Sequence, residues 1–314
     1  MNAKLKAIGI DIGGTKIALG AVDGTGCIRH RITMETKPEA GFENAVERMC
    51  RAVEGLLSHA AWTTGELSGV GIGCTGPVNP LRGTIHNPYT LPSWDDCNIV
   101  DTLQERLRVP VRLENDADAA LLGECFAGAG RGFDPVVMLT FGTGIGGATL
   151  VNGQLLRGVA GEHPELGHIP VTNDGTRCYC GRTGCLEAVA SGTAIETAGR
   201  KVGFTGCREI FAAAASGEVR AKAIVDVALR ATGVATWTIL HAFLPQRILL
   251  GGGIMDDHFD LFAETVRRGI EAATLAPSGQ ISVAKAALGN DAGLVGAASL
   301  AFAQTSNLHP TAQP

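Results

Sequence analysis

The chain has 314 residues, enough to bury a sizeable core, and its length suggests two domains. Its 26 lysines and arginines against 31 aspartates and glutamates leave a net charge of −5, which argues against a nucleic acid or a membrane surface as partner. Charges such as Asp226 and Arg230 interrupt the longest apolar runs, and the N-terminus lacks the apolar stretch of a signal peptide. We therefore expect no transmembrane helix, and nine reduced cysteines in a cytoplasmic protein.

The first half of the chain alternates strands and helices. A buried strand is expected at Ala7–Ile12, followed by a glycine turn and a second strand through Val22. Helically spaced apolar residues predict a helix over Ala45–Ser58. Four further elements follow in order: a strand at Val70–Cys74, a helix at Ile99–Leu107, a strand at Val109–Leu113 and a helix at Ala117–Ala127. The loop from Gly76 to Trp94 is too long for a plain connection and is expected to be functional.

The opening unit recurs about 130 residues later, as an internal repeat. A strand at Val136–Phe141, a turn at Gly142–Gly147 and a strand at Ala148–Val151 repeat the first pattern. The remaining elements are expected as helices at Thr193–Val202, Glu209–Ala215 and Arg220–Leu244, a strand at Arg247–Leu250, a helix at Phe259–Ala273, a strand at Ile281–Ala284 and a helix at Ala292–Ala303. This alternation predicts an α/β fold of two related domains around a cleft.

We place the domain boundaries from this order of elements. Residues 1–116 are expected to form a smaller N-terminal domain, completed by the C-terminal helix 292–303. Residues 117–291 are expected to form the larger domain. Residues 304–314 are expected to be a disordered tail.

Three cysteines and a histidine lie close together in the segment GEHPELGHIPVTNDGTRCYCGRTGCLE, which begins at Gly161. Such a set suits tetrahedral Zn²⁺, and four protein ligands leave no open position, so we expect a structural zinc. Reduced cysteines without a metal are the alternative. The expected ligands are His168, Cys178, Cys180 and Cys185. A metal here would also orient Glu165 and Glu187, which flank the ligands.

Glycine makes up 43 residues, about twice its usual share. Three glycine turns follow strands and could present backbone N–H groups to phosphate: Gly13-Gly14-Thr15, Gly142-Thr143-Gly144 and Gly251-Gly252-Gly253. A single turn of this kind is most often only a hairpin turn, but three together favour nucleotide binding. None matches a Walker A loop or a Rossmann fingerprint. Asp11 could hold Mg²⁺ through water or be a turn residue, and Lys16 could neutralise phosphate or be a solvated lysine.

Asn115 and Asp116 stand where a strand ends and a helix begins. Asp116 could be a simple helix cap. Its functional reading is a carboxylate that takes the proton from a hydroxyl as that oxygen attacks a γ-phosphate.

Five segments carry a resemblance to a known family: DIGGTK (Asp11–Lys16), LENDADAALLGE (Leu113–Glu124), TFGTGIGG (Thr140–Gly147), GEHPELGH with CYCGRTGCLE, and ILLGGGI (Ile248–Ile254). Together they resemble the ROK family of sugar kinases from Ile8 to about Ala303. The resemblance implies an actin-like, ribonuclease H-like two-domain ATPase that closes around sugar and ATP, with Mg²⁺ and a structural zinc. It implies that Asp116 is the catalytic base and that His168 serves both zinc and sugar.

The resemblance also implies two sets of binding residues. The expected substrate-binding residues are Gly76, Asn87, Asn115, Asp116, Glu165, His168 and Glu187. The expected nucleotide-binding residues are Asp11, Gly13, Gly14, Thr15, Lys16, Gly142, Thr143, Gly144, Gly251 and Gly252. The implied reaction is ATP-dependent phosphorylation of a hexose, with glucose to glucose 6-phosphate the first expectation, by a homodimer.

This sequence departs from the family pattern at two places. Three extra residues precede His168, so that Glu165 rather than Glu162 is the expected sugar contact, and His163 is expected only to pack or to hydrogen-bond its loop. Thr90 stands where glucose-specific members commonly carry asparagine, which keeps fructose and N-acetylhexosamine (GlcNAc or ManNAc) kinases as alternatives. A sugar-responsive transcriptional regulator is a further alternative. It would need a DNA-binding segment ahead of Asp11, where we expect no room for one.

Overall fold

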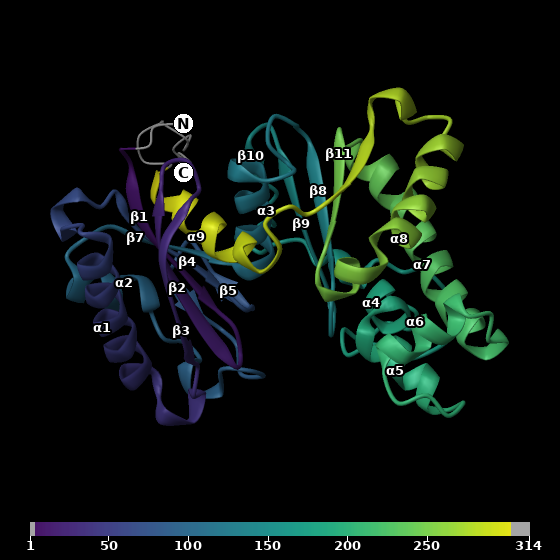
Figure 1. Cartoon of the computed structure of the whole chain (residues 1–314), viewed down its shortest axis with the longest axis horizontal. Coiled ribbons are helices and arrows are strands. Elements are labelled where there is room, and N and C mark those ends of the chain that lie inside the picture. Colours follow the sequence, from purple (N-terminus) through teal and green to yellow (C-terminus); the bar gives the residue numbers. More distant parts are fainter. Residues whose placement is uncertain (1–3, 303–314) are drawn as a thin grey trace. The chain divides into compact units, whose positions relative to one another are not determined.

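The computed structural model describes residues 4–302, which form two compact units (Figure 1). Unit 1 holds the chain up to residue 131, the short segment 157–163, and the chain from residue 287 onward. Unit 2 holds residues 132–156 and 164–286. Each unit contains one five-stranded sheet and its own apolar core.

The sheet of unit 1 has the strand order β3-β2-β1-β4-β7. The strands β1, β2 and β3 pair antiparallel, whereas β1, β4 and β7 run parallel. The strands are β1 (Lys6–Ile12), β2 (Lys16–Asp23), β3 (Ile28–Glu35), β4 (Gly69–Cys74) and β7 (Val111–Asn115). A small ribbon of β5 (Val78–Asn79) and β6 (Thr84–Ile85) lies within the long loop. The carboxyl ends of the parallel strands therefore meet at one edge of the sheet.

Two pairs of helices pack against this sheet. The helices α1 (Phe42–Ala60) and α2 (Ile99–Leu107) join the main core of unit 1, because their buried residues recur at helical spacing. The helices α3 (Asp116–Ala127) and α9 (Ala292–Phe302) pack against each other, and α9 also lies on β1 and β4. Glycine permits this close packing. A Cβ on Gly71 would lie 1.7 Å from the carbonyl oxygen of Ala297, and one on Gly296 would lie 1.6 Å from that of Ala119.

The sheet of unit 2 repeats the topology of unit 1, with the order β10-β9-β8-β11-β12 and the same succession of antiparallel and parallel pairs. Its strands are β8 (Val136–Phe141), β9 (Ile145–Val151), β10 (Gln154–Leu155), β11 (Arg247–Gly251) and β12 (Ser282–Lys285). The helices are α4 (Leu186–Ala190), α5 (Gly192–Arg200), α6 (Cys207–Ala215), α7 (Val219–Phe243) and α8 (Gly253–Ala272). The internal repeat expected from the two glycine-turned hairpins is confirmed.

By length and composition alone, α7 could cross a membrane. However, 44% of its most apolar window is buried inside unit 2, and its buried residues belong to the core of that unit. The apolar character of α7 is thus accounted for by its place among the other helices of the core.

The structure differs from the expected organisation at three points. The first boundary lies after residue 131 instead of residue 116, because α3 packs on α9 within unit 1. The helix expected from Phe259 already begins at Gly253, and Gly252 precedes it with φ of 88°. The polar edge strand β3 was not expected at all. The expected tail at 304–314 and the end of the C-terminal helix at Ala303 lie outside the described residues.

Candidate functional site

Asp116 lies at the carboxyl edge of the sheet of unit 1, as the first residue of α3 directly after β7. Strand register places Ile12, Cys74 and Asn115 side by side at this edge. The Asn115 side chain is buried and caps α3, because its Oδ1 accepts a hydrogen bond from the Ala117 N–H at 2.9 Å. Gly76 lies against the same side chain, and a Cβ on it would approach Asn115 Nδ2 to 2.7 Å.

The carboxylate of Asp116 is partly exposed, and its surroundings hold its pKa at about 6. Burial is the main cause of this raised pKa, and the negative charge of Asp11 adds to it. The N–H of Ala117 and the nearby His163 lower the pKa of Asp116 in part. A carboxylate with a pKa this close to neutrality can accept a proton and remain mostly ionised at pH 7.

The first glycine turn joins β1 to β2 next to this edge. The Gly13 N–H donates to the Lys16 carbonyl oxygen at 2.9 Å, and the Thr36 hydroxyl donates to the Gly13 carbonyl oxygen at 2.7 Å. Burial raises the pKa of Asp11 at this turn, while the charges of Lys16 and Arg31 lower it. Asp11 and Asp116 thus place two carboxylates at one edge, a donor set that suits Mg²⁺.

Asn87, an expected sugar contact, is 1% exposed and uses its side chain inside its own loop. Its Nδ2 donates to the Thr75 carbonyl oxygen and, at 2.7 Å, to Thr90 Oγ1, while its Oδ1 accepts from the N–H groups of Tyr89 and Thr90. Thr90 in turn lies against the glycine turn, since a Cβ on Gly14 would meet its Cβ at 3.2 Å. The geometry therefore makes Asn87 the residue that holds Thr90 in place.

The four expected zinc ligands come together in unit 2, with their ligand atoms all within 4.8 Å of one another. His168 Nδ1 lies 3.4 Å from Cys178 Sγ, and Cys180 Sγ lies 3.4 Å from Cys185 Sγ. Tetrahedral zinc with Zn–S bonds of about 2.3 Å needs ligand atoms roughly 3.5–3.8 Å apart. The donor set and its spacing fit Zn²⁺.

The second ring nitrogen of His168 faces the groups expected to bind sugar. His168 Nε2 lies 3.1 Å from the Tyr179 hydroxyl, which also hydrogen-bonds Glu187 and experiences the charge of Glu165. Tyr179 is largely exposed, and the partial loss of water around its hydroxyl, together with the Glu187 carboxylate, raises the pKa of Tyr179. The Tyr179 hydroxyl thus lies within hydrogen-bonding distance of both an imidazole nitrogen and a carboxylate. Glu187 Oε2 also accepts from the Ile145 N–H at 2.9 Å, which ties it to the second glycine turn.

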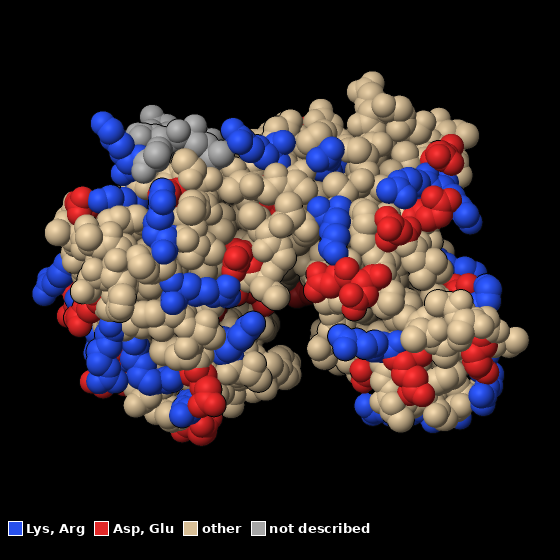
Figure 2. Space-filling view, in the orientation of Figure 1, with Lys and Arg blue, Asp and Glu red and all other residues tan. Residues whose placement is uncertain are grey.

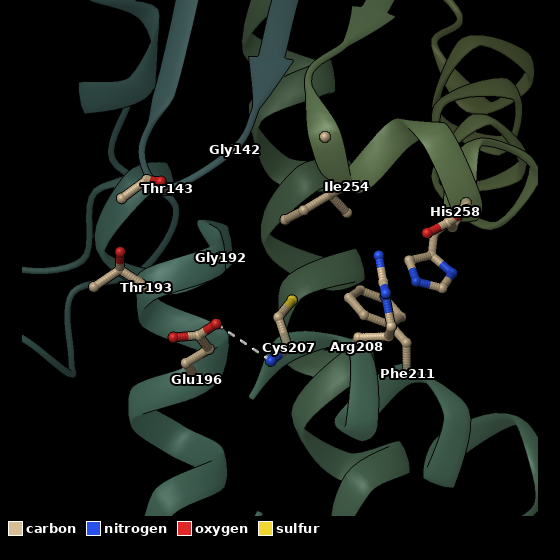
Figure 3. A pocket seen from close by; sticks show the side chains of 12 residues that line it. Gly142, Thr143, Gly192, Thr193, Glu196, Cys207, Arg208, Phe211, Ile254 and His258 are labelled. Carbon is tan, nitrogen blue, oxygen red and sulfur yellow. Dashed lines mark hydrogen bonds between the residues drawn. The ribbon is translucent and has the colours of Figure 1, made fainter. Parts of the chain in front are cut away.

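A cavity of about 470 Å³ opens beside the second glycine turn (Figure 3). Residues of the β8–β9 turn and of the N-terminal parts of α5, α6 and α8 line it. Phe211 and His258 form one apolar wall, with stacked rings 3.9 Å apart between centroids, and burial lowers the pKa of His258. The lining comprises Gly142, Thr143, Gly192, Thr193, Glu196, Cys207, Arg208, Phe211, Gly253, Ile254, Asp257 and His258.

Comparison with known proteins decides the family. The ROK family model matches residues 7–304. The chain belongs to the ROK family. The glucokinase of Thermotoga maritima is 35% identical to this ROK chain over 95% of it and 97% of the relative. A Thermus thermophilus ROK hexokinase structure superposes with a TM-score of 0.85 at 34% identity, over 96% of this chain and 99% of the other. A Streptomyces griseus ROK glucokinase, solved with glucose and AMPPNP, has a TM-score of 0.75 at 33% identity, over 95% and 99% of the two chains.

These matches confirm the expected fold, the actin-like ATPase fold of ROK kinases. Several residues of this ROK chain that line its cavity were missed by the sequence analysis, among them Thr193, Glu196, Arg208, Phe211 and His258. The only local signals were Ser191-Gly192-Thr193 and Gly206-Cys207-Arg208, each of which begins a helix. Gly251 and Gly252, which were expected in the site, do not line the cavity, whereas the adjacent Gly253 does.

The surface of this ROK chain carries mixed charge. Figure 2 shows lysines and arginines interspersed with aspartates and glutamates on the displayed faces of both units, with no broad field of one sign. This agrees with the small net charge of −5 and with small molecules as partners.

Proposed function

We propose that this protein is an ATP:hexose phosphotransferase that works in the cytoplasm. The observation that carries the proposal is Asp116, a partly exposed carboxylate with a pKa of about 6, at the sheet edge that also holds Asp11 and the first glycine turn. The kinase names of the similar proteins support the same activity. A coupled assay of ADP release with a hexose, ATP and Mg²⁺ tests it.

In this proposal the nucleoside-binding cavity belongs to unit 2 and the catalytic base to unit 1. The cavity of unit 2 binds the nucleoside, with Phe211 and His258 against the base, and Gly142 and Thr143 at the phosphates. Glu165, His168 and Glu187 bind sugar hydroxyls, and Asn115 and Gly76 shape the approach to the base. Asp116 takes the proton as the sugar oxygen attacks the γ-phosphate in line. Mg²⁺ near Asp11 would offset phosphate charge.

We propose a structural Zn²⁺ on the Cys₃His set. When zinc lies on Nδ1 of His168, the neutral ring must carry its proton on Nε2, the nitrogen that faces Tyr179 and Glu187. The metal would thereby fix His168 as a hydrogen-bond donor to the sugar. The same metal would also stabilise the loop, because it joins four ligands of one segment.

Among hexoses we expect glucose to be the best acceptor, with O6 as the attacking oxygen. The polar groups assigned to the sugar supply a partner for most hydroxyls of an aldohexopyranose, and a site built for hydroxyls rejects sugars that leave its groups unpaired. The measurement is kcat/KM for glucose, fructose, N-acetylglucosamine and N-acetylmannosamine with ATP and Mg²⁺. A tenfold preference for any of the other three overturns glucose as the substrate and leaves the kinase activity standing.

We also propose a homodimer that uses the outer face of α7. Val227, Val234 and Trp237 recur at helical spacing on this face, and each is between 43% and 46% exposed. A second copy of the chain offers the same apolar stripe, as a twofold interface requires. Trp237→Glu is expected to halve the mass measured by sedimentation velocity. The matched control is Leu275→Glu, which changes an exposed leucine outside α7; an unchanged mass for the Trp237 variant contradicts this interface.

A further inference from the structure

The seven residues 157–163 belong to unit 1, although the chain on both sides of them belongs to unit 2. The segment follows β10 and contains Arg157 and His163. Its loop is closed internally, because the Gly158 N–H donates to the Glu162 carbonyl oxygen at 2.8 Å, and Glu162 Oε2 accepts from the Ala160 N–H at 3.0 Å. A segment with this much internal order can carry a side chain to a defined place.

Arg157 joins two carboxylates that flank the proposed base. Its Nη1 donates to Asp118 Oδ2 at 2.6 Å, and its Nη2 donates to Glu114 Oε2. The side chain of Asp118 is fully buried, that of Glu114 is 14% exposed and that of Arg157 is 22% exposed. His163 Nδ1 lies 4.0 Å from the same Asp118 oxygen. All four groups belong to unit 1.

The two carboxylates stand on either side of the corner where β7 turns into α3. Glu114 is the last residue but one of β7, and Asp118 lies in the first turn of α3. Asp116 lies between them, two residues from each. A planar guanidinium that bonds both groups restricts the angle between strand and helix, because the donors of arginine have a fixed fork geometry. The direction of the Asp116 side chain depends on that angle.

The electrostatics follow the same arrangement. Burial raises the pKa of Glu114 to about 7, with the Arg157 charge acting against it and the Asp118 charge adding to it. The charges of Asp11 and Asp118 raise the pKa of Asp116, and that of His163 lowers it. Without the guanidinium, two largely buried carboxylates would lose their cation, and the negative charge of Asp118 beside Asp116 would be uncompensated.

We propose that Arg157 is a positioning residue for Asp116, holding the β7–α3 corner through Glu114 and Asp118. The proposal rests on the proposed function, in which Asp116 is the base. The proposal also gives His163 a role. This residue of the same segment places its ring nitrogen Nδ1 4.0 Å from Asp118 Oδ2. In the proposed site Arg157 is not a substrate contact, so it acts on turnover through the orientation of Asp116 and through the charge of Asp118 beside it.

The test compares Arg157→Met and Arg157→Lys with Arg51→Met, which removes an arginine from an exposed helical ion pair of the same unit. For Arg157→Met we expect kcat to fall at least about tenfold, the acid limb of kcat to move to higher pH, and KM for ATP to stay within about twofold. Arg157→Lys keeps the positive charge but loses the two-pronged guanidinium, so its kcat should lie between those of the unchanged protein and Arg157→Met. The double variant Arg157→Met/Asp118→Asn also removes one of the two carboxylates. Its acid limb of kcat should move back toward the pH of the unchanged protein.

A folded Arg157→Met protein with the wild-type kcat and acid limb overturns the proposal and reduces the cluster to a structural ion pair. If Arg157→Met does not fold, Arg157→Lys decides in the same way, since wild-type turnover in that variant also overturns it. Failure of the proposed function has a different signature. It appears as absent kinase activity in the unchanged protein, or as normal turnover in Asp116→Asn.

Discussion

Replacing Asp116 with asparagine is expected to lower kcat about 10²–10⁴-fold, because the amide keeps the size and hydrogen bonding of the side chain and removes the proton acceptor. Sugar binding should be nearly unchanged. In the unchanged protein, activity should fall as pH drops through about 6, since the base is then protonated. The residual activity of Asp116→Asn should lack that acid limb. The measurements are kcat from pH 5 to 9 and the Kd for sugar by calorimetry.

The matched control is Asp101→Asn, which changes an exposed aspartate in the first turn of α2, outside the residues assigned to the site. It should keep kcat and the acid limb. Near-normal turnover by Asp116→Asn that still binds sugar shows that another group takes the proton.

Removal of zinc is expected to have the second largest effect. One zinc per chain should be found by metal analysis, and Cys180→Ser should lose most of it. In our proposal the metal holds His168 toward the sugar, so its loss should raise KM for sugar about tenfold or more and lower Tm, with a smaller change in KM for ATP. Steady-state kinetics and thermal unfolding of both proteins provide the measurements.

Cys27→Ser serves as the control, since this exposed cysteine lies in unit 1, outside the metal cluster. It should keep the metal, Tm and KM. An active preparation that contains no zinc and has an unchanged KM for sugar removes the metal from the proposal.

Local patterns predicted the parts of the fold and site that are local in sequence. The hairpins around Gly13 and Gly142 were foreseen because a strand, a glycine turn and a strand follow one another directly. The cysteine cluster was predicted because Cys178, Cys180 and Cys185 lie within eight positions of one another, shortly after His168. The strand β3 was missed because its exposed residues are mostly polar and its apolar positions few.

Groups that come together from distant segments had no such pattern. Phe211 and His258 reach one wall of the cavity from α6 and α8. Arg157 reaches Glu114 from a segment 43 residues further along the chain. The role of Tyr179 at His168 also required coordinates, since its place between two cysteines says nothing of where its hydroxyl points.

The packing of α9 on β1, β4 and α3 has a consequence for synthesis on the ribosome. The strands of unit 1 have all emerged once Asn115 has left the exit tunnel, but the helix that covers β1 and β4 is not made until residues 292–302. Unit 2 ends at residue 286, so it can fold while the sheet made first still has one apolar face uncovered. During that interval one face of β1, the strand that carries Asp11, and of its neighbour β4 is open to chaperones and to aggregation.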